Sequence, residues 1–290
     1  VPIIMQNQLW GLLITHQCAH PREWTEWEIE LLQQLADQIG IAVSQAKLLE
    51  QETRQREELA RSNEELQQFA FIASHDLQEP LRKITTFGDR LKITCQNALT
   101  DKGYDYLHRM QNAAERMQVL IEDLLTLSRI TTRAQPFAEV NLSQVTQEVL
   151  SDLEIRITQS KARIEIGELP TIKADPLQMR QLLQNLISNA LKFHGQKEPI
   201  LVKIYSKKIT NQQLNSEFCQ IIVQDNGIGF NEKYLDRIFN VFQRLHGRTE
   251  YEGTGMGLAI CRKIVERHQG SITAKSEPGK GAMFIITVKN

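Results

Sequence analysis

Three polar side chains recur on one face of a helix predicted over residues 175–193. Asn185, Asn189 and Lys192 are spaced at i, i+4 and i+7, so they lie on the same side of that helix. Amide oxygens are neutral, hard donors, which suit a Mg²⁺ ion that a nucleotide triphosphate already partly neutralises. This face could therefore hold a metal and a phosphate, although the spacing taken alone is better explained as a solvated helix face.

Two glycine-rich segments follow on the chain. DNGIGF, residues 225–230, comes after an apolar strand, and its Gly227 and Gly229 allow the backbone to approach a ligand closely, while Asp225 can accept a hydrogen bond. GTGMGL, residues 253–258, opens a helix whose free N–H groups suit phosphate oxygens. Its glycines are Gly253, Gly255 and Gly257. Taken alone, each segment is better explained as a surface turn.

Several other phosphate-binding patterns are absent from the sequence. Leu258 stands where a dinucleotide-binding G-x-G-x-x-G needs its third glycine, and there is no G-K-[ST] of a P-loop. The H-R-D and D-F-G segments of serine, threonine and tyrosine kinases are also missing.

The asparagine helix, DNGIG and GTGMGL, in this order, resemble the ATP-binding domain of sensor histidine kinases. The resemblance extends back to SHDLQEPL, residues 74–81, which is similar to the phosphoacceptor box of the same family. In that family the box lies on the first helix of a dimeric hairpin, upstream of the ATP domain, as it does here. Together the matches cover roughly residues 69–290.

The resemblance implies a nucleophile in the box. His75 would attack the γ-phosphate of ATP, because neutral imidazole is nucleophilic near pH 7. Asp76 would take or hold the proton on the other ring nitrogen. The phosphoryl group would then pass to an aspartate on the receiver domain of a response regulator. A non-catalytic, dimeric scaffold that binds nucleotide is the alternative, against which His75 with its adjacent carboxylate argues.

The resemblance also assigns the nucleotide site, with ATP and Mg²⁺ as its cofactors. Asn189 would bind Mg²⁺, and Asn185 and Lys192 would contact phosphates. Asp225 would accept the adenine amino group and disfavour guanine, which has a carbonyl there. The remaining implied nucleotide contacts are Phe193, Gly227, Gly229, Arg244, Gly253, Gly255 and Gly257. The resemblance also implies a lid over the nucleotide with Phe239 and Phe242 in its aromatic segment. The basic residues of this lid either contact phosphates or form a solvated basic loop; they are Arg244, His246 and Arg248.

Three positions depart from related patterns. Asn185 stands where other ATPases of this fold type have a water-activating glutamate, which disfavours hydrolysis by this domain alone. Ala282 replaces a threonine that many relatives place near adenine, and Glu79 replaces a Thr or Asn four residues after the histidine.

The N-terminal piece predicts a strand hairpin with a Gln-Asn turn. LWGLLITHQCAHPREW resembles the last strands and exit helix of a GAF domain of the phytochrome or cyanobacteriochrome type, over about residues 1–49. We expect Cys18 to be a buried structural thiol rather than a bilin attachment site.

Long helices must connect this remnant to the ATP domain. Residues 35, 39, 42, 46 and 49 are apolar with a 4, 3, 4, 3 spacing, which predicts a coiled-coil seam in a long helix from residue 23. A helical hairpin is predicted over residues 66–130, with its join at 97–103, and two hairpins would make a homodimeric four-helix bundle. A short linker is expected at residues 131–137.

Beyond residue 138 the pattern predicts an α/β sandwich, so the fold class is α+β. The expected strands are 163–167, 171–174, 200–206, 218–224, 271–274 and 283–288, and the expected helices are 143–159, 175–193 and 256–268. The expected domains are a GAF remnant (1–22), a signalling coiled coil (23–68), a dimerisation and phosphotransfer hairpin (69–131) and an ATP-binding domain (138–290).

Composition restricts the partners. Lys and Arg total 34 against 35 Asp and Glu, a net charge of -1 that gives no reason to expect nucleic-acid or membrane binding by bulk charge. No apolar run approaches the length of about 18 residues that spans a bilayer. The four separate cysteines are expected to be reduced, in a cytoplasmic protein, and the start at Val1 indicates a fragment of a longer chain.

Overall fold

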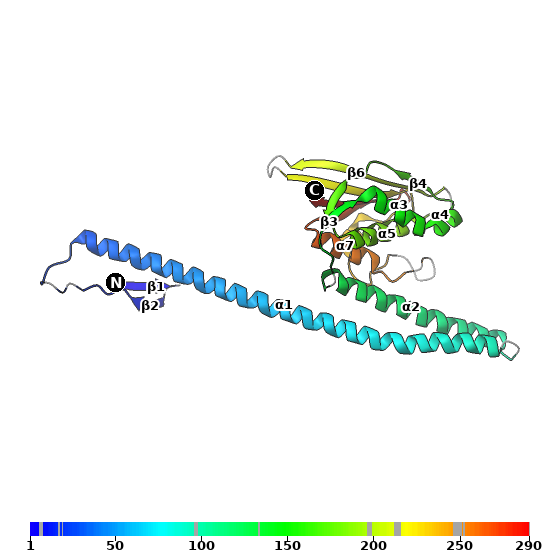
Figure 1. The fold of residues 1–290 in the computed structure, drawn as a ribbon, viewed down its shortest axis with the longest axis horizontal. Helices are drawn as coiled ribbons and strands as arrows, with labels where there is room; N and C mark the ends of the chain where they lie inside the picture. Colours follow the sequence, from blue (N-terminus) through cyan, green and yellow to red (C-terminus); the bar gives the residue numbers. More distant parts are fainter. Residues whose placement is uncertain are drawn as a thin grey trace. The chain divides into compact units, whose positions relative to one another are not determined.

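The computed structural model describes residues 1–5, 8–16, 18, 20–95, 98–132, 134–195, 199–211, 216–245, 251 and 253–289. For residues 63, 64, 66–71, 75, 131, 210, 211, 216 and 217 it describes the backbone alone. The chain has two compact units, Val1–Phe69 and Ala70–Asn290. Figure 1 shows the elements in chain order.

The first unit begins with the predicted hairpin. β1 (Pro2–Met5) and β2 (Gln8–Leu12) pair antiparallel, with Pro2 opposite Leu12. The predicted Gln6–Asn7 turn lies outside the described residues. The hairpin packs closely on the following helix, because a Cβ at Gly40 would lie 2.7 Å from the Ile4 carbonyl oxygen. The expectation of a buried Cys18 is wrong, since this thiol is exposed and no part of the small hairpin covers it.

Helix α1 (Glu26–Thr94) is one continuous helix that passes through Pro80. The predicted seam is open to solvent in a single chain, with Leu35 at 47% and Leu49 at 65% exposure. An apolar stripe of this kind is stable when a second helix covers it. In the part of the chain that the structure describes, no helix is both long and apolar enough to cross a bilayer.

Helix α2 (Asp101–Thr132) returns along the last part of α1 to form the predicted helical hairpin (Figure 1). The expected join reached to Gly103, but the helix already begins at Asp101 because the Thr100 hydroxyl accepts the Gly103 N–H at 3.2 Å. Gln111 of α2 donates to the Asp89 carboxylate of α1 at 2.7 Å. That contact sets which residues of the two helices lie side by side.

The C-terminal domain is the predicted α/β sandwich. Its sheet contains β4 (Arg163–Ile166), β6 (Leu201–Asn211), β7 (Ser216–Asp225), β9 (Ala282–Lys289) and β8 (Ser271–Ser276), in this spatial order. β4 runs parallel to β6, and the other neighbours are antiparallel. A second, two-stranded sheet pairs β3 (Ala138–Asn141), which the sequence did not predict, with β5 (Thr171–Ala174).

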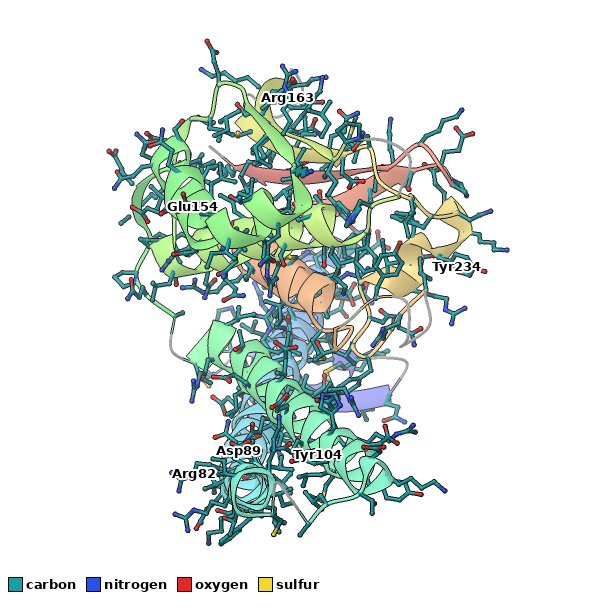
Figure 2. All side chains as sticks on the ribbon, turned by 90° about the vertical axis from the view of Figure 1, so that its right-hand side faces the viewer. Arg82, Asp89, Tyr104, Glu154, Arg163 and Tyr234 are labelled. Carbon is teal, nitrogen blue, oxygen red and sulfur yellow. The ribbon has the colours of Figure 1, made fainter. Side chains whose placement is uncertain are left out.

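Helices cover one face of the larger sheet (Figure 1). They are α3 (Leu142–Asp152), α4 (Glu154–Ser160), α5 (Pro176–Lys192) and α7 (Gly257–Arg267). The single helix expected over residues 143–159 is interrupted at Leu153, whose buried side chain joins the core between α3 and α4. Two short helices follow the DNGIGF segment: η1 (Glu232–Tyr234) and α6 (Leu235–Ile238). Tyr234, the last residue of η1, is labelled in Figure 2.

A buried polar network joins the ends of α5 and α7. Asp175 caps α5, because its Oδ1 accepts the N–H groups of Leu177 and Gln178 at 3.1 and 3.3 Å. Its Oδ2 accepts from Arg267 Nη1 at 3.0 Å, and its backbone N–H donates to His268 Nε2 at 3.1 Å. Burial lowers the pKa of His268, which is consistent with a neutral ring whose Nε2 accepts.

The Arg267 side chain also holds the segment that enters the domain. Its Nη2 donates to the Gln135 carbonyl at 2.9 Å, and the Gln135 N–H donates to Asp175 at 2.8 Å. The Phe137 ring stacks on His268 with centroids 4.6 Å apart. The linker predicted at 131–137 is therefore bonded to the domain where it enters it.

Replacing Arg267 by Met should lower the free energy of unfolding by about 2–4 kcal/mol, because the Asp175 carboxylate, only 2% exposed, would lose its cation. Urea unfolding of the full chain measures this change. Arg163→Met is the matched control, since Arg163 pairs with Glu165 while 77% exposed and should contribute less than about 1 kcal/mol. Similar losses in both variants would contradict the importance of this network.

Candidate active site

The predicted asparagine face lies on the C-terminal half of α5. Asn185 and Asn189 are half-buried and one turn apart, and Lys192 follows at the last turn. Asn185 Nδ2 donates to the Gly257 carbonyl of the GTGMGL segment at 3.2 Å. The structure thus brings together two motifs that are 72 residues apart in the chain.

Aromatic and basic side chains continue this face past the end of α5. Lys192 Nζ lies 4.4 Å from the centroid of the Phe193 ring, which in turn lies 5.1 Å from the Tyr251 ring. The Tyr251 hydroxyl donates to the His194 carbonyl at 3.2 Å. A Cβ at Gly253 would lie 2.6 Å from Lys192 Nζ, so a side chain there would displace the lysine. Tyr251 was not predicted, although it lies only two residues before the glycine segment.

Asp225 ends β7 and is 9% exposed. Its Oδ1 accepts the N–H groups of Gly227 at 2.8 Å and Ala282 at 3.2 Å. Desolvation by burial raises the pKa of Asp225 to about 6, and these two hydrogen bonds oppose the rise. Ala282 stands where many relatives have a threonine, and its backbone N–H still donates to the Asp225 carboxylate. A poorly solvated carboxylate of this kind is a strong acceptor for a ligand N–H group.

The DNGIGF segment packs directly on the end of α5. The Ile228 N–H donates to the Phe193 carbonyl at 3.0 Å. A Cβ at Gly227 would lie 2.0 Å from the same carbonyl oxygen, so only glycine fits.

The other side of this segment contacts the GKG turn before β9. Gly229 has φ +59°, and a Cβ there would lie 2.2 Å from the Glu277 carbonyl oxygen. Gly281 has φ +86°, and its Cβ would lie 2.0 Å from the Asp225 carbonyl oxygen. Gly281 was missed as a site residue, although the repeated glycine in GKG was a usable signal.

The GTGMGL segment bends sharply before it enters α7. Gly253 and Gly255 have φ of +134° and +78°, and a Cβ at Gly255 would lie 2.7 Å from the Gln243 carbonyl oxygen. The Arg244 guanidinium donates to the carbonyls of Gly253 and Tyr251. Arg244 thus holds the backbone of this segment.

The lid expectation is wrong for Phe239. This ring is 4% exposed within the hydrophobic core and lies 5.0 Å from the Arg262 guanidinium, because the short α6 turns it inward. Phe242 is 56% exposed with φ +60°. His246 and Arg248 lie outside the described residues.

The SHDLQEPL box lies on α1 in the hairpin. The backbone at His75 is helical, and the side chain of His75 lies outside the described part of the chain. Asp76 is exposed, Ser74 is buried, and the Glu79 carboxylate pairs with Lys83 at 2.8 Å on the surface. The roles of His75 and Asp76 stay predictions.

A further contact at the glycine segment was not predicted. The Thr254 hydroxyl donates to the Asp123 carboxylate of α2. The two residues are 131 positions apart, and a lone aspartate within a helix carries no signal of such a partner.

The residues present fit Mg-ATP. Asn185 and Asn189 offer amide oxygens, Lys192 offers a cation, and the entry to α7 carries glycines, which add no side chain between a phosphate and the start of the helix.

Comparison with protein families identifies three stretches. Residues 1–43 match the GAF domain, and residues 65–133 match the His Kinase A (phospho-acceptor) domain. Residues 174–290 match the histidine kinase-, DNA gyrase B- and HSP90-like ATPases.

Curated relatives include phytochrome-like proteins and circadian input-output histidine kinases of cyanobacteria. Phytochrome-like protein Cph1 of Synechocystis sp. is 41% identical over 242 residues, which are 81% of this chain and 31% of the relative. Circadian input-output histidine kinase CikA of Synechococcus elongatus is 29% identical over 99% of this chain and 41% of the relative. The chain thus spans well under half the length of these relatives.

A solved structure shares the fold. Full-length ShkA in complex with AMPPNP superposes with a TM-score of 0.57 and 25% identity, over 76% of this chain and 45% of that chain. With its phosphoacceptor hairpin, its ATPase domain and a preceding GAF segment, the chain belongs to the sensor histidine kinases.

Proposed function

We propose that the chain transfers the γ-phosphoryl group of Mg-ATP to His75 and passes it on to an aspartate of a response-regulator receiver domain. The observation that carries the proposal is the contact between the asparagine face and GTGMGL, in a chain whose hairpin helix presents SHDLQEPL. Each half supplies what the other lacks, since one binds a phosphate donor and the other offers an acceptor.

In the transfer step, one nitrogen of the neutral His75 imidazole forms a bond to the γ-phosphorus. The bond from that phosphorus to the β–γ bridging oxygen breaks, and ADP leaves. Asp76 receives or holds the proton of the other ring nitrogen, which stabilises the charge that develops on the ring. Asn185 and Lys192 orient the phosphates, because positioning and electrostatics supply most of the catalysis of phosphoryl transfer. Mg²⁺, held by Asn189, would neutralise charge on the phosphate oxygens.

Adenine recognition is assigned to Asp225. Its carboxylate accepts the exocyclic amino group, and the N–H groups of Gly227 and Ala282 hold the acceptor in place. Guanine would present a carbonyl oxygen to the same carboxylate, and two acceptors repel. Asn185 supplies no general base, so the phosphoryl group is directed to His75 rather than to water.

The acting form is a cytoplasmic homodimer, in which two hairpins form a four-helix bundle. Apolar side chains on both hairpin helices are exposed in a single chain and would be covered there. They include Leu77, Phe87, Leu91, Met110 and Met117. The domain limits proposed above, 1–22, 23–68, 69–131 and 138–290, place this bundle between a sensory remnant and the ATP domain.

Incubation of the full chain with γ-labelled ATP and Mg²⁺ should yield label that acid removes and base does not, because the N–P bond of phosphohistidine behaves in that way. His75→Ala should abolish the label. His108→Ala, an exposed histidine on α2 of the same hairpin, is the matched control and should retain it. Acid-stable label, or label that persists in His75→Ala, would indicate a different acceptor, and absence of label would favour the scaffold.

Asp225→Asn should weaken ATP binding by about 1.5–3 kcal/mol, because it replaces a charged acceptor with an amide that can mispair. Titration calorimetry with ATP and GTP measures the loss and the preference for adenine. With the pKa of Asp225 raised to about 6, the acceptor form is lost as the pH falls below that value, so ATP affinity should decline there. The variant corrects for protonation of ATP itself. Equal affinities for ATP and GTP in the unmutated protein would exclude this role.

A further inference from the structure

The C-terminal half of α2 packs against the ATP domain. Ile130 is 4% exposed within the core of that domain, and Leu124 and Leu127 pack against the same core. Gln178 Nε2 of α5 donates to the Ile130 carbonyl at 2.8 Å. Apolar burial of this kind supplies affinity but little orientation, because the hydrophobic effect is not directional.

The apolar stripe of α2 formed by Leu124, Leu127 and Ile130 has a second polar contact, at its other end. Asp123, one residue before Leu124, accepts a hydrogen bond from the Thr254 hydroxyl. That hydroxyl also accepts the Met256 N–H at 3.3 Å, at the start of α7. Asp123 is half-buried, and burial raises its pKa, so the carboxylate has lost part of its hydration and depends on this partner.

The contact involves the segment assigned to phosphate binding. Thr254 stands between Gly253 and Gly255, whose positive φ values bend the chain into α7. The Asp123 carboxylate therefore bonds to a side chain within the phosphate segment and not to a distant part of the ATP domain.

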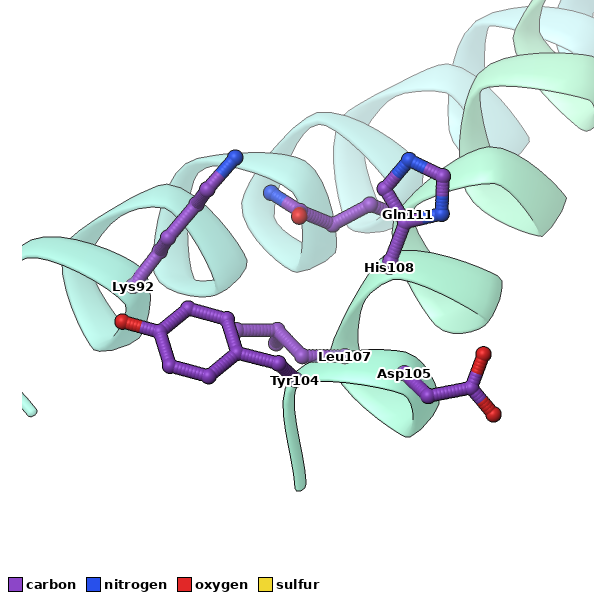
Figure 3. Close-up of a pocket in the computed structure, with 6 residues that line it drawn as sticks. All are labelled: Lys92, Tyr104, Asp105, Leu107, His108 and Gln111. Atoms are coloured by element: carbon purple, nitrogen blue, oxygen red, sulfur yellow. The ribbon is translucent and has the colours of Figure 1, made fainter. Parts of the chain in front are cut away.

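The pairing of the two hairpin helices gives the position of the Asp123–Thr254 contact along the hairpin axis, which we call its height. Gln111 of α2 bonds to Asp89 of α1, near the closed end of the hairpin, where Figure 3 shows Gln111 with its neighbours Lys92, Tyr104 and His108. Asp123 lies twelve residues from Gln111, and His75 lies fourteen residues from Asp89, in the same direction because the helices are antiparallel. At about 1.5 Å per residue these distances are roughly 18 and 21 Å, so Asp123 and the His75 backbone lie at heights less than one helical turn apart.

We propose that Asp123 is a positioning residue for autophosphorylation, which by binding Thr254 holds the phosphate segment of the ATP domain at the height of His75. The inference rests on the kinase function proposed above. The apolar stripe keeps the domain on the hairpin, and the hydrogen bond selects the orientation in which donor and acceptor meet. A displacement of about 1 Å can cost about a hundredfold in such a reaction.

The central experiment compares Asp123→Ala with the unmutated full chain. The rate of His75 labelling at saturating Mg-ATP should fall about 10- to 100-fold, while the Kd for ATP changes less than about twofold, because Asp123 is not assigned to the nucleotide. Asp123→Asn retains an oxygen acceptor and should recover most of the rate. Glu122→Ala, on the adjacent exposed position of α2, is the control for lost negative charge and should label normally.

The partner residue provides an independent set of variants. Thr254→Ser keeps the hydroxyl and should label at nearly the normal rate, whereas Thr254→Val should be slow. If the two side chains act through one contact, the double variant Asp123→Ala with Thr254→Val should be no slower than the slower single variant. If Asp123→Ala folds poorly, Asp123→Asn, Thr254→Ser and Thr254→Val still test the contact, because these three changes conserve size.

The outcomes separate this inference from the proposed function. Absence of His75 label in the unmutated chain would overturn the kinase function itself. Normal label in the unmutated chain, with an unchanged rate in Asp123→Ala, would overturn only the positioning role. A faster rate or tighter ATP binding in Asp123→Ala would also overturn it, since the contact would then restrain the domain.

Discussion

The ATP domain depends on one buried carboxylate. Asp175 caps α5, accepts from Arg267 at the end of α7, and receives the Gln135 N–H of the entering chain. α5 carries the asparagine face, and α7 begins at the glycine segment, so both halves of the proposed phosphate site lie on helices that meet at Asp175. A carboxylate that is 2% exposed is stable in this place because Arg267 and the N–H groups of Gln135, Leu177 and Gln178 donate to it.

At the proposed nucleotide site, loops approach one another more closely than side chains would allow. Gly227 lies against the Phe193 carbonyl, and Gly281 lies against the Asp225 carbonyl, at distances where a Cβ would clash. Asp225 is buried at this point, and burial raises its pKa to about 6 against the opposing hydrogen bonds from Gly227 and Ala282. The glycine turns therefore surround a poorly solvated carboxylate at this end of the sheet.

The hairpin and the ATP domain are connected by more than the chain between them. Ile130 belongs to the core of the ATP domain, and Gln178 and Thr254 each bond to α2. The helix that ends the phosphoacceptor hairpin is thus also a wall of the catalytic domain.

The sequence alone determined most of the element types, the order of the motifs and the family, because helical periodicity, β-branched runs and glycine turns are local properties. It missed β3 and the break between α3 and α4 at Leu153. It predicted Asn185, Lys192, Asp225 and the glycine segments as one site through their resemblance to a family pattern. It could not reveal the Asp123–Thr254 contact, the Arg267 network or the burial of Phe239. These depend on residues more than ninety positions apart in the first two cases, or on how a short helix turns against the core in the third. Only the tertiary structure decides them, because hydrogen bonding and burial depend on which distant segments pack together.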